Sequence, residues 1–307
     1  MKRKTGRYGQ IVLALQGHKD KIMITLPETK FLITQFSQGW LTIWFNSPEN
    51  RNALSAQLTD ELMQTFQLIE HDRTVRGITL RGKGGVFCAG GDLKEFHGIA
   101  SGASRDDIIA MNERGGELFA KINSMPQAVL VLVEGAAIAG GLGMVCCADM
   151  VAVTRDAKFS LTETQLGIVP AQIAHYIVKR LGLNQARRLM LSGARFNGDE
   201  AFKIGLADFV AKDNAELEAI EAHFKKDVLG CAPNANAITK DILLKTGELT
   251  PSEMRTFAAN RFADAMLSDE AKEGISSFIG KRKPVWAQPV RALEDINRAN
   301  GKSEDEV

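Results

Sequence analysis

The chain has 307 residues, of which 45% are hydrophobic and 24% are charged, enough to bury the core of one large α/β domain. Its 38 basic and 37 acidic residues leave a formal net charge of +1, which argues against a general attraction to nucleic acid or to anionic membranes. The apolar stretches, such as Ala128–Val133, are far shorter than the roughly 20 residues that span a bilayer.

The first half of the chain alternates short apolar runs with polar or glycine-rich turns. We expect residues 1–30 to form a basic N-terminal extension, in which Gln10–Leu15 fits an edge strand. Two short strands are predicted next, at Phe31–Phe36 and Trp40–Phe45. From Leu54 to Ile69 apolar residues recur every three or four positions, which predicts an amphipathic helix. The elements expected after it are a buried strand at Gly77–Arg81, a glycine-rich loop at Lys83–Gly91, a helix opening at Leu93 and a helix at Asp106–Ile122.

Small and apolar residues dominate the next part of the chain, and helical patterns dominate after Pro170. The elements expected are a buried strand at Ala128–Glu134, a run of small residues at Gly135–Gly143, a buried helix at Leu142–Ala148, and strands at Asp149–Thr154 and Ala157–Ser160. Pairs of strands that are each followed by a helix predict an α/β fold, with a mixed sheet inside and helices outside. The glycines of Lys83–Gly91 match neither the GxGxxG spacing of dinucleotide folds nor the GK[ST] ending of nucleotide triphosphatases.

The cysteines argue against a metal centre. Cys88, Cys146, Cys147 and Cys231 form no CxxC pair, and no Cys/His spacing is typical of a metal site. We therefore expect buried thiols, no bound metal and a reducing, cytoplasmic location.

Two segments together carry a resemblance to a known family. Gly85–Phe96 reads GVFCAGGDLKEF, and the stretch from Val133 to Pro170 contains VEGAAIAGGLGMVCCAD followed by AKFSLTETQLGIVP. In this order and spacing the segments resemble the crotonase (enoyl-CoA hydratase/isomerase) superfamily. Supporting matches are NSPENRNALS at Asn46–Ser55, ARRLMLSGARFNGDEAFKIGLADFV at Ala186–Val210 and SSFIGKRKPVW at Ser276–Trp286.

The resemblance implies a crotonase-like spiral of ββα units and a helical C-terminal part that mediates trimerisation. It divides the chain into an extension (1–30), a catalytic core (31–210), the helical part (211–290) and a polar tail (291–307). It also implies an acyl-CoA substrate, a homotrimer or a dimer of trimers, and no cofactor beyond the CoA thioester itself. The amides of Gly91 and Gly140 would stabilise the thioester enolate, because two fixed N–H donors can bind the negative oxygen.

The resemblance further implies a CoA site along the first glycine loop and the preceding turn. The residues concerned are Arg51, Asn52, Ala53, Leu54, Ala89, Gly90, Asp92, Lys94 and Ala171, together with Phe278 and Lys281 from a neighbouring subunit. Backbone atoms of Asn52–Leu54 would hold adenine, and Lys94 would face the phosphates. The alternative for Arg51, Lys94 and Lys281 is a solvated surface charge. Asp92 fits a helix cap, and Phe278 fits a packing residue.

Glu163 is the candidate catalytic acid, because it falls where the family has the second of two glutamates. An acid beside an apolar acyl pocket is where a raised pKa is expected. The first glutamate would fall on Gly143, where this chain has no side chain. We expect the glycine to leave a gap, used for a branch of the acyl chain or for a second water. A single carboxylate can still move a proton between two positions.

A finer resemblance is to the isohexenylglutaconyl-CoA hydratase branch, which acts in acyclic terpene breakdown. It rests on AGGLGMVCCAD, TETQLGIVPAQIAHYIV and CAPNANAITKDIL, and that branch also has glycine in place of the first glutamate. Hydration of a branched enoyl-CoA is therefore the favoured function. The alternatives are a 3-enoyl-CoA to 2-enoyl-CoA isomerase that uses Glu163, and a noncatalytic RNA-binding or scaffold protein that uses the basic start.

Overall fold

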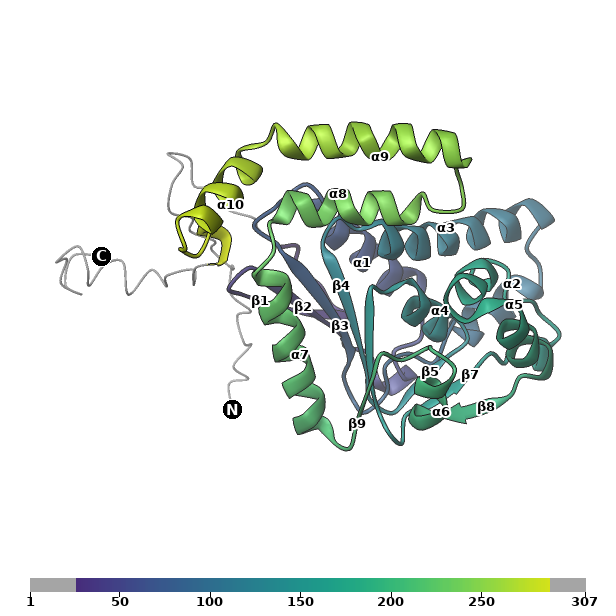
Figure 1. The fold of residues 1–307 in the computed structure, drawn as a ribbon. Coiled ribbons are helices and arrows are strands. Elements are labelled where there is room, and N and C mark those ends of the chain that lie inside the picture. Colours follow the sequence, from purple (N-terminus) through teal and green to yellow (C-terminus); the bar gives the residue numbers. More distant parts are fainter. Residues whose placement is uncertain (1–25, 288–307) are drawn as a thin grey trace.

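A mixed six-stranded sheet forms the centre of the protein. The computed structural model describes residues 26–287 (Figure 1). The strand order is β1 (Leu32–Ser37), β2 (Trp40–Phe45), β3 (Gly77–Gly82), β4 (Ala128–Val133), β6 (Met150–Thr154) and β9 (Phe209–Ala211). β1 and β2 are antiparallel and all later neighbours are parallel, so the predicted mixed sheet is confirmed.

A second, three-stranded sheet and ten helices complete the described part of the chain. The small sheet has the order β5 (Ala136–Ile138), β7 (Lys158–Ser160) and β8 (Arg195–Asn197). The helices are α1 (Ala56–Ile69), α2 (Leu93–Ala100), α3 (Arg105–Ser124), α4 (Gly140–Cys147), α5 (Ala174–Ser192), α6 (Gly198–Lys203), α7 (Asn214–Leu229), α8 (Pro233–Leu244), α9 (Pro251–Met266) and α10 (Asp269–Ile279). Within residues 26–287 no helix has the length and apolarity needed to cross a membrane.

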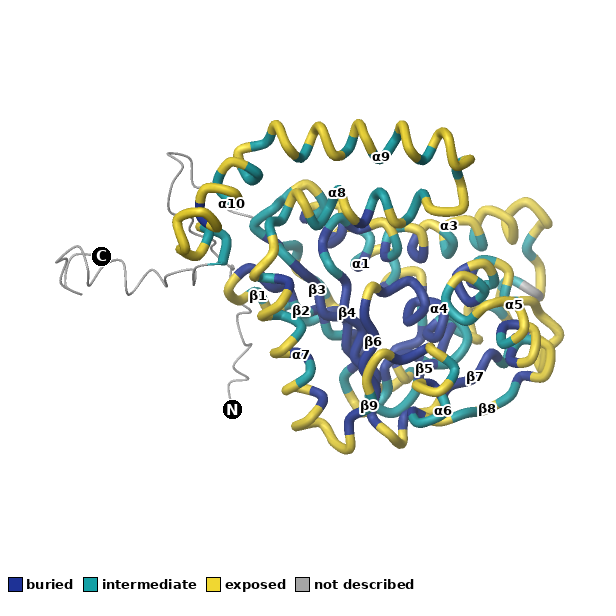
Figure 2. Tube along the Cα trace, viewed as in Figure 1, coloured by how far each residue is buried: buried dark blue, intermediate teal, exposed yellow. Residues whose placement is uncertain are grey.

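The two faces of the large sheet carry separate apolar cores. In β4, Val129, Val131 and Val133 belong to the larger core, which includes the inner faces of α1, α3 and α4. Leu130 and Leu132 point the other way, into a smaller core under α7. This alternation follows from the two-residue repeat of a strand. Figure 2 shows the outcome: α4 is buried inside the molecule, whereas α9 is exposed along its length.

The predicted elements are reproduced with small changes of boundary, and three features differ. Leu54 lies outside α1 and pairs with Gly91 in an isolated bridge, because Ser55 caps the helix with its side chain. The small-residue run contains β5, and the region after Pro170 contains β8 and β9. Each of these strands has three residues, too few for a periodic pattern. Leu26, which we placed in the extension, packs against the core, and Gln10–Leu15 lies outside the described residues.

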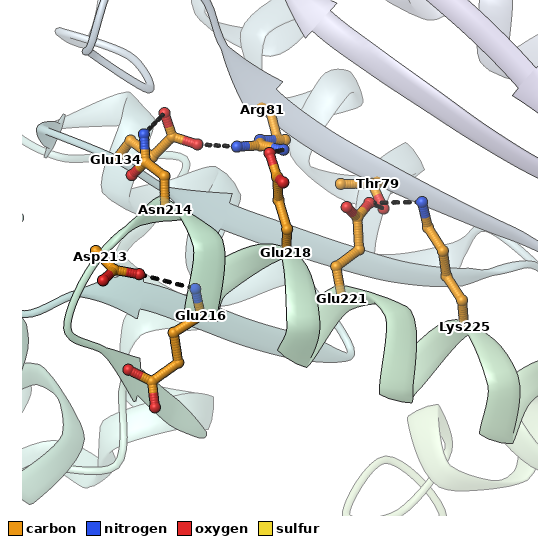
Figure 3. Close-up of polar contacts among 9 residues, drawn as sticks. All are labelled: Thr79, Arg81, Glu134, Asp213, Asn214, Glu216, Glu218, Glu221 and Lys225. Atoms are coloured by element: carbon orange, nitrogen blue, oxygen red, sulfur yellow. Dashed lines mark hydrogen bonds and ion pairs between the residues drawn. The ribbon is translucent and has the colours of Figure 1, made fainter.

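A polar network holds α7 on the sheet (Figure 3). The Thr79 hydroxyl donates to Glu221 Oε1 at 2.6 Å and accepts from Trp40 Nε1 at 2.8 Å. Lys225 completes the ion pair with Glu221 at 2.8 Å. Nearer the start of α7, Arg81 pairs with Glu134, and Asn214 donates to the same carboxylate at 3.4 Å. The smaller core under α7 is thus bordered by paired polar side chains, although the buried Nε of Arg81 has no hydrogen-bond partner.

We expect Thr79→Val to destabilise the protein by about 1–3 kcal/mol, because it leaves the buried Trp40 N–H without an acceptor. Urea unfolding measures the change. Thr239→Val is the matched control: Thr239 is exposed and its hydroxyl donates only to the carbonyl of Ala235, so its effect should stay within about 0.5 kcal/mol. Equal stabilities of the two variants would contradict a structural role for the Thr79 bridge.

Candidate active site

The two glycine-rich segments singled out by the sequence lie side by side. The N–H groups of Phe87 and Cys88 donate to the carbonyl of Ala136 at 3.0 and 3.1 Å. The N–H of Ile138 donates back to the carbonyl of Cys88 at 3.0 Å, so the segments form an isolated parallel bridge between Cys88 and Ala137. A site can therefore be formed jointly by residues about fifty positions apart in the chain.

Gly91 and Gly140 present free backbone N–H groups at this junction. Within residues 26–287, neither N–H donates to a backbone acceptor. Gly140 is the first residue of α4, where an N–H has no partner within the helix. The preceding Ala139 has φ +50° and provides no side-chain cap, so the helix start stays open. An oxyanion placed here would also be favoured by the dipole of α4.

A cavity of about 450 Å³ opens onto these amides. It is bounded by the start of α1, by α2 and α3, by the start of α4, and by the segment from Thr162 to Ile173. Apolar lining residues include Leu93, Phe96, Met111, Leu118, Phe119, Leu166, Ile168, Val169 and Ile173. Of the predicted site residues, those that line it are Leu54, Ala89, Gly91, Gly140, Glu163 and Ala171. The structure thus brings the proposed donors and the proposed base to one space.

Glu163 begins the short 3-10 helix Glu163–Leu166 and is 8% exposed. Its Oε2 atom is buried and has no hydrogen-bond partner. Burial raises the pKa of this carboxyl above its ordinary value, because the charged form loses water. An unpaired carboxylate on a cavity wall is free to take a proton from a bound molecule and to return it.

The predicted CoA turn is built on Asn52. Its Oδ1 accepts from the N–H of Ser47 at 2.8 Å, and its Nδ2 donates to the carbonyls of Lys83 and Val86 at 2.9 and 2.7 Å. Asn52 is fully buried and has φ +55°. Its hydrogen bonds to Lys83 and Val86 fasten the turn to the glycine loop. The loop is also joined to Arg51, whose carbonyl accepts from the N–H of Ala89 at 3.1 Å, and the next predicted residue but one, Ala53, is buried.

The remaining predicted CoA residues lie outside the cavity lining. Asp92 caps α2 by accepting from the N–H groups of Lys94 and Glu95 at 2.8 and 3.4 Å, as expected of a helix cap. Lys94 is exposed on α2. Gly90 is part of the glycine loop, and its carbonyl accepts from the N–H of Leu54 at 2.7 Å. Phe278 and Lys281 lie at the end of α10, on the opposite side of the molecule from α2 (Figure 1). Within one chain these two residues do not meet the cavity.

Comparison with known proteins agrees with this geometry. A family model described as Enoyl-CoA hydratase/isomerase matches residues 35–289. A protein of Bacillus subtilis (strain 168) named as a probable enoyl-CoA hydratase is 34% identical over 240 residues, 76% of this chain and 90% of the relative. The chain belongs to the enoyl-CoA hydratase/isomerase family.

The peroxisomal Delta(3,5)-Delta(2,4)-dienoyl-CoA isomerase of Arabidopsis thaliana is 29% identical over 257 residues, 79% of this chain and 91% of that protein. Among solved structures, Pseudomonas aeruginosa AtuE superposes with a TM-score of 0.82 at 42% identity, covering 84% of this chain and 100% of that one.

Family membership confirms the superfamily, the fold class and the assignment of the chain as an acyl-CoA enzyme.

The space beside Gly143 differs from what the sequence predicts. We expected an open gap there, and that expectation is wrong. A Cβ at Gly143 would overlap Ile173 and would lie 3.2 Å from Phe119 Cε1. Both of these side chains line the cavity, and Gly143 itself does not. An apolar wall therefore occupies the space beside Gly143.

The wall formed by α3 is the part of the cavity that sequence reasoning missed. Met111, Asn112 and Phe119 of α3 line it, and the Asn112 side chain accepts from Gln172 Nε2 at 2.7 Å across the cavity edge. Periodicity predicted the helix but could not show which side faces substrate, because apolar residues suit a core and a pocket equally well. The adjacent glycines Gly115 and Gly116 were the one feature of the α3 sequence that could have indicated the side facing the cavity.

Gly143→Ala should destabilise this enoyl-CoA hydratase/isomerase family member by about 1–3 kcal/mol, since β-branched Ile173 cannot turn aside easily. Ile173→Ala alone is also destabilising, since Ile173 is buried, but the double variant should lose less stability than the sum of the two single variants, because the added methyl then has room. A double-mutant cycle in urea isolates the coupling. Strictly additive effects would mean that Ile173 does not fill the space over Gly143.

Proposed function

We propose that this enzyme hydrates a branched enoyl-CoA of the isohexenylglutaconyl-CoA type. The observation that carries the proposal is the buried, unpartnered Glu163 carboxylate in the same cavity as the Gly91 and Gly140 amides. The apolar lining suits a hydrocarbon branch. Asn112, Arg114 and Gln172 also line the cavity and supply donors for a carboxyl group on such a chain.

The thioester oxygen would accept hydrogen bonds from the Gly91 and Gly140 N–H groups. Glu163 would remove one proton from a water molecule as the water oxygen bonds to the β carbon. The electron pair of the carbon–carbon double bond moves toward the carbonyl and forms an enolate, which the two amides stabilise. Glu163 then returns the proton to the α carbon, so that one water is added overall. The chemistry needs no cofactor beyond the CoA thioester.

Isomerisation of a 3-enoyl-CoA is the second candidate, and the replacement of the first glutamate by Gly143 favours it. Glu163 would take a proton from the α carbon and return it to the γ carbon through the same enolate. One assay separates the two reactions. Hydration adds the mass of one water to the thioester, whereas isomerisation leaves the mass unchanged. Mass spectrometry on linear, branched and carboxylated enoyl-CoAs detects hydration, and the absorbance of the conjugated thioester detects isomerisation. Absence of both changes would refute the proposal.

The proposal includes a homotrimer or a dimer of trimers in which a neighbouring copy supplies Phe278 and Lys281 to the CoA site. The support is the apolar surface of the last two helices. Phe278 is 86% exposed and Leu267 is 79% exposed, and Phe262 and Ile279 are exposed nearby. Several large apolar side chains exposed on two consecutive helices are typical of an interface between subunits.

Glu163→Gln should lower kcat by on the order of a hundredfold or more with little change in KM, because the shape is kept and the base is lost. In the wild-type protein, kcat/KM should rise with pH through a pKa above the ordinary glutamate value, since the base must be ionised and burial raises its pKa. Steady-state kinetics across pH measure both effects. Turnover at the wild-type rate by the variant would place the base elsewhere.

The same variant has a second readout in stability. A carboxyl whose pKa is raised on folding stabilises the folded state at low pH, and this contribution is lost as pH rises through the folded pKa. At neutral pH, Glu163→Gln should therefore raise the melting temperature, and the difference should disappear in acid. A purely structural role for Glu163 would lower the melting temperature instead.

Gly140→Pro should lower kcat/KM by on the order of a hundredfold, which corresponds to a loss of about 3 kcal/mol of transition-state stabilisation, because it deletes one oxyanion donor. Proline is tolerated at the first position of a helix, where the N–H has no helical partner. Gly140→Ala keeps the N–H, adds a Cβ about 3.0 Å from Leu54 Cδ1, and is the steric control. With circular dichroism showing both folded, equal activities would show that the Gly140 amide is not a donor to the oxyanion.

A further inference from the structure

Helix α3 contains two adjacent glycines, Gly115 and Gly116, near its middle. Glycine destabilises a helix interior relative to alanine, since it loses more backbone freedom on folding. Neither residue has a positive φ, so backbone conformation does not require glycine at either position. Each therefore needs a reason in its surroundings.

Packing explains Gly116. A Cβ there would overlap the carboxamide of Gln172, which lies against this part of the helix. The contact lets Gln172 Nε2 donate to Asn112 Oδ1, one turn earlier on α3. Gly116 thus allows the segment after Pro170 to approach α3 and to close one edge of the cavity.

Packing does not explain Gly115. A Cβ at this position would have no heavy atom within 4 Å, yet Gly115 lines the cavity. Its neighbours on the same wall are the larger apolar residues Met111, Leu118 and Phe119. The missing side chain leaves open space at this point of the wall, which we call the recess. The space beside Gly143, by contrast, is filled by Ile173.

We propose that Gly115 determines acyl-chain selectivity, because its recess in the α3 wall takes the branch of a branched acyl-CoA. The inference rests on the proposed function for the class of substrate. A side chain at position 115 would occupy the recess and exclude the branch, whereas a linear chain would still fit. The helix keeps a destabilising residue because a larger one would block the ligand.

Binding of saturated thioesters tests the recess without any reaction, because they can be neither hydrated nor isomerised. The probes are octanoyl-CoA and the branched 3,7-dimethyloctanoyl-CoA, which share a main chain of the same length, with Kd measured by calorimetry on the full-length protein. Gly115→Leu should raise Kd for the branched probe by on the order of 10–100-fold and change Kd for octanoyl-CoA less than about threefold. Gly115→Ala should shift the ratio in the same direction by a smaller factor, while its melting temperature rises by about 1–3 °C.

Gly98 provides the matched control. It also lies in a helix, α2, has open space around a built Cβ, and does not line the cavity. Gly98→Leu should leave the ratio of the two Kd values unchanged, and Gly98→Ala should raise the melting temperature as Gly115→Ala does. An unchanged ratio in folded Gly115→Leu and Gly115→Ala would overturn the proposal.

The two proposals fail separately. If the wild-type protein neither hydrates nor isomerises enoyl-CoAs but Gly115→Leu shifts the Kd ratio, the selectivity role of Gly115 stands and the proposed reaction falls. If the wild-type protein turns over a branched enoyl-CoA and the Kd ratio stays the same in both variants, the proposed reaction stands and the role of Gly115 falls.

Discussion

The site depends on one backbone contact, in which the segment around Cys88 runs directly against the segment Ala136–Ile138. The contact requires residues without side chains. A Cβ at Gly135 would overlap the carbonyl of Gly85, and one at Gly141 would lie 2.5 Å from the carbonyl of Cys88. Because the segments touch, the Gly91 and Gly140 amides reach one cavity, and the start of α4 faces it without a cap. A bulky residue at either glycine would separate the two donors.

Several features that reduce stability gather around this cavity. Ala139 has a positive φ, Glu163 keeps a buried carboxylate oxygen without a partner, and Gly115 lies in the interior of α3. Each has a cost that an ordinary core position would avoid. Their concentration at one place is typical of a site in which geometry for a ligand outweighs local stability. Under α7, on the far face of the sheet, Thr79 and Glu221 show the contrasting arrangement, because both are buried and both are hydrogen-bonded (Figure 3).

The resemblance places the first of the two glutamates at Gly143, and Ile173 fills the space beside this glycine. Two carboxylates can divide the handling of water between them, whereas in the proposed reaction Glu163 alone would accept the proton and deliver it. The raised pKa of Glu163 would suit both steps, since it brings the protonated and ionised forms closer in free energy. The apolar wall formed by Ile173 and Phe119 favours hydrocarbon on this side of the cavity.

The sequence by itself determined the strands up to β7 except β5, the helices up to α4, the largely helical character of the rest, and the family, because these follow from local periodicity and from motifs in a characteristic order. The sequence did not predict β5, because its three residues are too few to show the alternation of apolar and polar residues that is typical of a strand. Only the tertiary structure decided which side chains share a space. Gly143 suggested a gap in the sequence, but Ile173, thirty positions later, fills it. Leu54 suggested a helix and instead bridges to Gly91. A glycine can leave cavity space open, as at Gly115, or make room for a neighbouring side chain, as at Gly116. Which of the two occurs depends on how close the fold brings another segment, and no local sequence pattern encodes the distance between segments.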